Sequence, residues 1–311
     1  MEQAGTSVVA LFAARMEVAT LALWAALLIG YFIGQFLPVF LLVEQAGKLA
    51  AYFGRKLNRH SRDVATRAWR GVVVLSFFLV PAMLVGLLLG RALPHWAEGL
   101  VVAMLFTSAL RSHRIRALWQ QARAKQLTLQ AKGRKHLFKD THGVLRFEIL
   151  DHANHFAIGI LGAWLWYLLG GLSLMFGYLA LAFASTAYAT EHEENRAFGG
   201  VARSLFAMLD AGPRLLAAGL LLVASLFVPG CKAMAAVKYW PQAGVKWHAF
   251  LAALLNISLG GPMPLARRTH HSEWVGEGSA QLTSADLTRW VLLWMVSLLM
   301  LGLTGLGWMI L

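Results

Sequence analysis

Two histidines mark the first place where this sequence could do chemistry. His152 and His155 lie three residues apart, with Ala153 and Asn154 between them. In a helix this spacing puts both imidazoles on one face, where they could bind a metal ion together. No third ligand stands nearby. We therefore favour a simpler interpretation, in which Asn154 and His155 belong to a polar helix start in the lipid headgroup layer.

A second cluster is acidic and extends from Glu191 to Arg196. It contains three carboxylates, Glu191, Glu193 and Glu194, and carboxylate oxygens are suitable ligands for Mg²⁺. Acidic residues are also favourable in the first turn of a helix, because they interact with the helix dipole. We favour this solvated helix start and keep a Mg²⁺ site as the alternative.

The third cluster is rich in glycine. It comprises two short runs near the C-terminus: Gly260, Gly261 and Pro262, then Trp274, Gly276 and Gly278. Glycines let a backbone approach a bound anion closely. Two ordinary turns would explain the pattern as well, so both interpretations stay open, although the second glycine pair strengthens the case for a binding loop.

The composition excludes most soluble classes. Of the 311 residues, 58% are hydrophobic and 14% are charged, whereas soluble domains carry about a quarter charged residues. This excludes a cytosolic enzyme, a disordered chain and a disulfide scaffold, and the one cysteine, Cys231, cannot form an internal disulfide. No P-loop, dinucleotide fingerprint, nucleophile elbow or zinc-protease motif is present. The net charge is +13. The basic residues that produce it lie between long uncharged runs, which indicates membrane loops rather than a nucleic-acid partner.

We therefore predict an all-α, polytopic integral membrane protein with about five transmembrane helices, amphipathic surface helices and ordered cytoplasmic loops. A helix crosses the hydrocarbon core with about 20 apolar residues. The longest run exceeds one upright span, and Gly170-Gly171 near its middle predicts a break, so this run crosses once or twice. We expect no charged residue inside any span. The predicted runs are Val18–Val43, Gly71–Gly90, Gly99–Leu110 with Ala92–Ala97 before it, His152–Thr190, Leu215–Cys231 and Trp290–Leu311.

Lysine and arginine predict the orientation. The loop Lys48–Arg70 has seven basic residues and one acid, and the loop Arg111–Arg146 has ten and one. Cytoplasmic loops carry such an excess, so we place both loops in the cytoplasm and the N-terminus outside. Helical spacing in Ala117–Gln130 predicts a helix on the membrane surface. We expect residues 1–311 to form one membrane domain.

The C-terminal residues resemble a known family. The runs Ala252–Pro262 and Trp274–Gly278, with Leu282, Asp286 and Arg289 after them, resemble the C-terminus of the CobD/CbiB family. Those proteins are integral membrane adenosylcobinamide-phosphate synthases of cobalamin biosynthesis. Less specific likenesses extend the resemblance over residues 20–311: Ala109–Ser112, Lys139–Thr141, Arg146, Tyr178, Phe198-Gly199 and Pro241–Gly244. The resemblance implies a multi-pass protein of the bacterial inner membrane.

Several acidic positions of that family are replaced here. Ile158, Ser185, Phe206 and Ala207 stand where the family pattern has Asp, and Asn154 stands where it has Glu. The family reaction, as the resemblance implies, joins a corrinoid carboxylate to aminopropanol or its phosphate with ATP and Mg²⁺. Carboxylates hold such a Mg²⁺, and these side chains cannot. We therefore expect a degraded site, a pseudoenzyme and no cofactor, with ATP and Mg²⁺ bound only if the family activity is retained.

Three function classes remain open. The first is an enzyme of late cobalamin assembly that uses relocated ligands. The second is a non-enzymatic regulator or assembly partner of the same fold, like the AmpE proteins, and the third is a transporter, ranked last because the spans lack charges. Expected partners are the lipid bilayer and either a corrinoid or another membrane protein, with no nucleic acid.

We expect the family-like residues to surround one cytoplasm-facing cavity. The candidate ligand-binding residues are Asn154, His155, Gly159, Glu193, Arg196, Gly199, Gly260, Gly261, Pro262, Trp274, Gly276 and Asp286.

Overall fold

The computed structural model describes residues 2–32, 49, 52–54, 56–58, 63–110, 141–188, 196–265 and 268–310. It is mostly helical, which confirms the predicted fold class. The elements are α1 (Glu2–Phe32), α3 (Val64–Ala92), α4 (His95–Leu110), α6 (Thr141–Asn154), the π-helix η1 (His155–Gly162), α7 (Ala163–Tyr188), α8 (Arg196–Ala224), α9 (Ala233–Val237), the 3₁₀ helix η3 (Trp240–Gln242), α10 (Trp247–Leu255), β1 (Leu259–Leu265), β2 (Arg268–Val275) and α11 (Ser284–Ile310).

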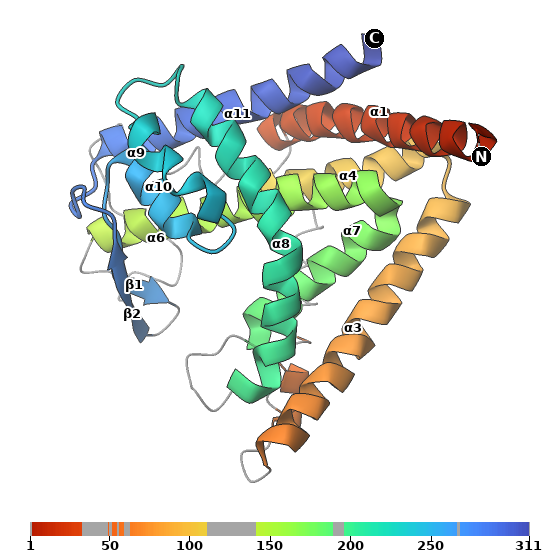
Figure 1. The fold of residues 1–311 in the computed structure, drawn as a ribbon, viewed down its shortest axis with the longest axis horizontal. Coiled ribbons are helices and arrows are strands. Elements are labelled where there is room, and N and C mark those ends of the chain that lie inside the picture. Colours follow the sequence, from red (N-terminus) through yellow and green to blue (C-terminus); the bar gives the residue numbers. More distant parts are fainter. Residues whose placement is uncertain are drawn as a thin grey trace. The chain divides into compact units, whose positions relative to one another are not determined.

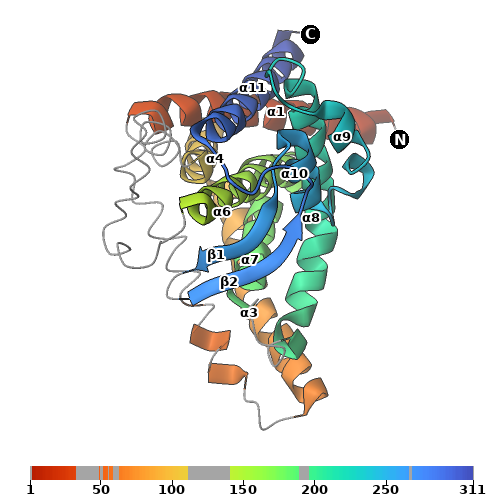
Figure 2. The ribbon, with the colours of Figure 1, turned by 90° about the vertical axis from the view of Figure 1, so that its left-hand side faces the viewer.

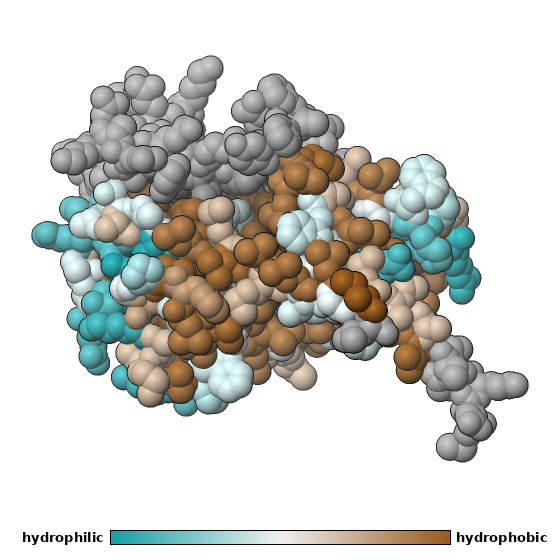
Figure 3. All heavy atoms as spheres, turned by 90° about the horizontal axis from the view of Figure 1, so that it is seen from above, coloured by the Kyte–Doolittle hydropathy of each residue, from teal (hydrophilic) through white to brown (hydrophobic). Residues whose placement is uncertain are grey.

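Among the described residues, five helices are long and apolar enough to cross a membrane, as predicted. They are Val8–Ile29, Val64–Ala92, His142–Tyr188, Ala197–Ala224 and Ser284–Ile310. In a space-filling view, apolar residues cover much of the middle of the face shown and hydrophilic residues gather toward its ends (Figure 3). The chain is therefore a multi-pass membrane protein by the length and composition of its helices.

The boundaries of all five candidate spans differ from the prediction, since each begins earlier than expected and contains charged residues. The first begins about ten residues before Val18 and contains Arg15 and Glu17. The third begins at His142 rather than His152 and contains Arg146, Glu148 and Asp151, and the fourth begins before Leu215 and contains Arg203, Asp210 and Arg214. The expectation that no span holds a charge was therefore wrong. Spans were delimited by uncharged runs, and a buried charge that finds polar partners does not end a helix.

Two compact units divide the chain, each built from segments far apart in sequence. Unit 1 comprises residues 1–110, 158–213 and 308–311, and unit 2 comprises residues 111–157 and 214–307. The described residues of each unit are considered separately below.

In unit 1, α7 is bent at the predicted glycine pair. Gly170 and Gly171 have non-helical backbone angles, and Gly171 has a φ of 64°, a conformation that glycine adopts without strain. The bend divides α7 into two arms, and the second arm lies against α3 (Figure 1). This arm is antiparallel to α3, because Leu172 lies beside Gly86 and Tyr188 belongs to the same apolar cluster as Val74.

In unit 2, α6 and the N-terminal part of α11 contact each other at two positions along α6. His142 Nδ1 lies 2.9 Å from the carbonyl oxygen of Leu282, just before α11, and Trp290 Nε1 donates to His152 Nδ1 over 3.2 Å. The low-numbered end of α6 therefore lies beside the start of α11, and both helices run in the same direction. These contacts fix the N-terminal ends of α6 and α11 at one end of unit 2.

An antiparallel hairpin follows α10, where the sequence predicted only ordered loops. Strands β1 and β2 pair from Leu259 opposite Val275 to Leu265 opposite Arg268, with an irregular register near Gly260. The hairpin lies beside α6 (Figure 2). Glycines and prolines in β1 hid this strand from a reading based on β-propensity, because both residues are depleted in strands.

Candidate functional site

Arg146 of α6 connects the separate C-terminal motifs in unit 2. One guanidinium nitrogen donates to the carbonyl oxygen of Ala280 over 2.7 Å, and the other lies 3.4 Å from that of Pro262. The guanidinium carbon lies 4.8 Å from the ring centroid of Trp274, within range of a cation–π interaction. Arg146 therefore contacts three points of the C-terminal motifs, all more than a hundred residues after it in the sequence.

Residues 256–262 and 272–280 form a compact structure that we call the glycine platform. At Gly261, where φ is 69°, an added Cβ would lie 2.2 Å from the indole of Trp274; at Gly276, where φ is 100°, it would lie 2.5 Å from the carbonyl oxygen of Ile257. Both positions exclude a side chain. Ser258 Oγ lies 3.1 and 2.7 Å from the carbonyl oxygens of Gly276 and Gly278. The two predicted loops are thus joined by hydrogen bonds into one structure.

The platform presents a half-exposed aromatic ring. Trp274 is 52% exposed, and its ring lies close both to the guanidinium of Arg146 and to the backbone of Gly261. An exposed indole beside a fixed positive charge suits a planar or anionic group. Gly260, Gly261, Pro262, Trp274 and Gly276 lie together in the platform, and Arg146, which was not among the candidate ligand-binding residues, contacts Pro262 and Trp274 of this set. Its contacts could not be found from spacing, since they need the tertiary fold.

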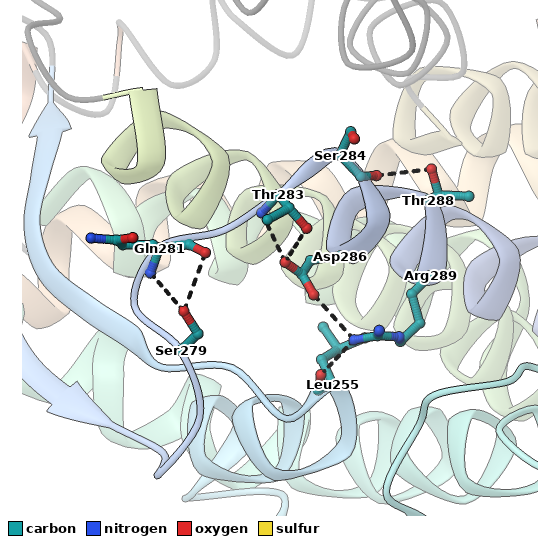
Figure 4. Close-up of polar contacts among 8 residues, drawn as sticks. All are labelled: Leu255, Ser279, Gln281, Thr283, Ser284, Asp286, Thr288 and Arg289. Atoms are coloured by element: carbon teal, nitrogen blue, oxygen red, sulfur yellow. Dashed lines mark hydrogen bonds and ion pairs between the residues drawn. The ribbon is translucent and has the colours of Figure 1, made fainter. Parts of the chain in front are cut away.

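Asp286 has a structural role at the start of α11. Its carboxylate accepts hydrogen bonds from the backbone N–H and the hydroxyl of Thr283, both over 2.8 Å. It also accepts one from Arg289 over 3.1 Å, and Arg289 donates to the carbonyl oxygen of Leu255 over 3.0 Å (Figure 4). The bond from the Thr283 N–H to the Asp286 carboxylate is one half of a capping box, and the ion pair with Arg289 extends it. The spacing Thr-x-x-Asp before an apolar run was the signal for it.

The histidine pair does not act as one unit in the structure. His152 Nδ1 accepts from Trp290, and its ring packs against Trp294 with centroids 4.8 Å apart. His155 Nδ1 lies 2.7 Å from the carbonyl oxygen of Asp151. Among the described residues, no three His, Cys, Asp or Glu side chains come together as a metal site. The two histidines therefore contact different residues: His152 contacts α11, and His155 contacts the preceding turn of its own helix.

Asn154 lies where α6 gives way to the π-helix η1, which starts at His155. The Oδ1 atom of Asn154 is buried, and within the described part of the chain it has no hydrogen-bond partner. π-Helical turns are frequent at functional sites, and a buried acceptor is costly when unsatisfied. Asn154 stays a candidate ligand-binding residue on these two observations.

The candidates in unit 1 lie at close helix contacts. An added Cβ at Gly159 would lie 2.6 Å from the Cβ of Ala109, and one at Gly199 would lie 2.9 Å from the carbonyl oxygen of Tyr188. Arg196 begins α8, and its side chain lies outside the described residues, as do Glu191, Glu193 and Glu194. The cavity expected around Asn154, His155, Glu193, Arg196, Gly260 and Gly261 stays a prediction.

A buried carboxylate in unit 1 was missed by the sequence reading. Asp210 is 2% exposed and accepts a hydrogen bond of 2.7 Å from the hydroxyl of Tyr178. The ring of Tyr178 lies near Trp166, at 6.1 Å between centroids, and near Phe206, at 5.8 Å. The signal was available, because an ionisable residue within an apolar helix is rare.

Phe206 and Ser185 stand at positions where the resemblance places acids, and both make local contacts instead. Phe206 contacts Tyr178 as just described, and Ser185 Oγ donates to the carbonyl oxygen of Ala182, one turn earlier in its own helix, over 2.8 Å. A phenyl ring offers no ligand to Mg²⁺, and a hydroxyl offers only one neutral oxygen in place of a carboxylate. The described residues at these positions do not fit a carboxylate-held Mg²⁺.

The structure thus defines a multi-pass helical membrane protein with a glycine platform at the start of its last long helix. Two curated relatives match nearly the whole chain. They are the "Cobalamin biosynthesis protein CobD" of Brucella melitensis biotype 1 and that of Brucella suis biovar 1, each 26% identical over 321 aligned residues, which cover 93% of this chain and 96% of the relative. The chain is therefore similar to CobD proteins over nearly its whole length. No family model matches the chain, and no solved structure matches it.

Proposed function

We propose that this chain is a CobD-like protein of cobalamin biosynthesis in the bacterial inner membrane, in which the site for adenosylcobinamide-phosphate synthesis is degraded. The similarity to the Brucella proteins over 93% of the chain supports the pathway. The observation that carries the loss of catalysis is the packing of Phe206 and Ser185, since these side chains stand where the family has acids.

The effect of these replacements on catalysis should be large. Groups that stabilise developing charge each contribute on the order of 10²–10³ in rate. Ile158 and Ala207 add two more positions without a carboxylate. Losses within one site are not additive, but four replaced positions leave little for the remaining groups to supply. Asp286 does not compensate readily, because Thr283 and Arg289 already bind its carboxylate.

The glycine platform supports a retained binding role. The glycines and Trp274 of the platform are family-like residues that lie together beside Arg146. The positions in unit 1 where the resemblance places acids have lost their carboxylates. We propose that a corrinoid, or another membrane protein, binds there without turnover. A regulator of the AmpE type is the second candidate, favoured by the same replaced acidic positions. A corrinoid-binding assay distinguishes these two candidates, because only the first requires corrinoid binding.

Complementation tests the proposal in cells. In a strain that lacks adenosylcobinamide-phosphate synthase, this chain should not restore cobalamin synthesis, whereas the Brucella melitensis CobD protein expressed at the same membrane level should restore it. Full rescue would overturn the degraded site. If Glu193→Gln then abolished the rescue, an enzyme with relocated ligands would be the correct account.

Binding of a corrinoid carboxylate to the purified protein in nanodiscs tests the second part, and the colour of the corrinoid provides the readout. Trp274→Ala should weaken binding. Trp308→Ala is the matched control, because Trp308 is also about half exposed, at 48%, and belongs to unit 1. Absence of binding to the unmodified protein would favour the regulator.

A further inference from the structure

The segment between α8 and α10 exposes large apolar side chains outside the candidate membrane spans. We call residues 226–246, which include α9 and η3, the anchor segment. Met234 is 86% exposed and Val245 is 92% exposed. Large apolar side chains are exposed along the whole segment: Leu226, Phe227, Met234, Val237, Trp240 and Val245. Isolated exposed apolar residues are ordinary, but a series within one short segment marks an interaction surface.

The same segment carries charge of one sign. Lys232, Lys238 and Lys246 are exposed, and residues 211–272 contain no Asp or Glu at all. Apolar side chains interleaved with lysines fit the boundary between anionic headgroups and acyl chains. A protein partner with an acidic surface would satisfy the lysines but not the apolar side chains beside them.

Ordered contacts hold the segment in place. The indole N–H of Trp240 donates to the carbonyl oxygen of Leu215 in α8 over 3.2 Å, and the backbone N–H of Lys232 donates to that of Leu254 in α10 over 2.8 Å. Two residues of the segment itself, Ala236 and Ala243, are fully buried. The exposed apolar side chains are therefore displayed from a fixed scaffold, which lowers the entropy lost on binding.

We propose that the anchor segment inserts into the headgroup region of an anionic lipid leaflet, with Met234 and Val245 reaching the acyl chains and the three lysines binding lipid phosphates. This surface is separate from the glycine platform. It makes the region between α8 and α11 a lipid-dependent element rather than a freely solvated loop.

Fluorescence quenching in reconstituted vesicles tests the proposal. In the full chain carrying Cys231→Ser, a bimane label is placed at Met234→Cys, at Val245→Cys or, as control, at Glu277→Cys, which is exposed after β2. Spin-labelled lipid should quench the first two labels at least about twofold more than the control, and aqueous iodide should quench them less. Size-exclusion profiles like that of the parent show that each variant is folded.

Equal iodide quenching at all three positions, with none from lipid, would overturn the proposal. Protection from both quenchers that rises with protein density would also overturn it, because a second copy would then be the occupant.

A charge variant, Lys232→Gln with Lys238→Gln and Lys246→Gln, tests the lipid type. In vesicles with phosphatidylglycerol, each removed charge should lower the ratio of inserted to solvated segment about fivefold. In pure phosphatidylcholine the same variant should behave like the parent. An unchanged ratio in phosphatidylglycerol would overturn the assignment to anionic lipid.

Discussion

The contact between α3 and the second arm of α7 depends on a glycine that leaves no room for a methyl group. An added Cβ at Gly86 would lie 2.4 Å from the carbonyl oxygen of Leu172 and 2.8 Å from the Cα atom of Ser173. All three nearest atoms belong to the backbone, so no side chain can rotate away. We predict that Gly86→Ala forces the two helices about 1 Å apart, because carbon and oxygen atoms in contact are usually at least about 3.4 Å apart.

The cost can be separated from helix propensity by a matched variant. Gly90 lies one turn later in α3, and an added Cβ there would meet nothing within 4 Å. Alanine is favoured over glycine by about 0.5–1 kcal/mol in a helix, and this gain should apply at both positions. The difference between the two variants therefore isolates the packing cost, roughly 1–3 kcal/mol. It also includes strain on the bond from Ser173 Oγ to the carbonyl oxygen of Met83, now 2.9 Å.

Reversible unfolding by sodium dodecyl sulfate in mixed micelles measures both variants against the parent. Gly90→Ala should unfold at the same or a slightly higher detergent fraction, and Gly86→Ala at a clearly lower one. Equal stability of the two variants would refute the antiparallel packing of α3 on the second arm of α7.

Three further predictions concern the cap, the cysteine and the topology. Thr283→Ala and Asp286→Ala should each lower the free energy of unfolding by about 1 kcal/mol, and a double-mutant cycle should show that the two losses are not additive; additive losses would count against the capping box. Burial raises the pKa of the Cys231 thiol to about 11, so alkylation by iodoacetamide, followed by mass spectrometry, should still rise about tenfold per pH unit between pH 9 and 10; a plateau near pH 9 would contradict this. A reporter fused near Arg123 should read as cytoplasmic, and a periplasmic signal would reverse the orientation.

Features that depend on local sequence were predictable. The bend at Gly170-Gly171 follows from a conformation that few other residues adopt, and the helical class follows from the length of the apolar runs. The capping box at Asp286 was readable from its spacing to Thr283, yet the same residue was taken as a ligand candidate. A short motif does not say which of its functions the fold uses.

Features that depend on distant contacts were not predictable. Arg15 lies within the first span, although the prediction began that span only at Val18, and its guanidinium donates to the carbonyl oxygen of Leu168 over 3.3 Å. That carbonyl lies close to the bend of α7, where the regular helix hydrogen bonds are interrupted, so the charge stays inside a helix. The pair Tyr178 and Asp210 and the contacts of Arg146 likewise join residues that no local pattern relates.

Turnover by the purified protein tests the central claim most directly. The full chain in nanodiscs is supplied with a corrinoid carboxylate, aminopropanol phosphate, ATP and Mg²⁺, and the amide product is measured by mass spectrometry, with a Brucella CobD protein as the positive control. We predict no product above the protein-free background, because Ile158, Ser185, Phe206 and Ala207 provide no carboxylate for Mg²⁺. Product formation at a rate within tenfold of the control would contradict a degraded site.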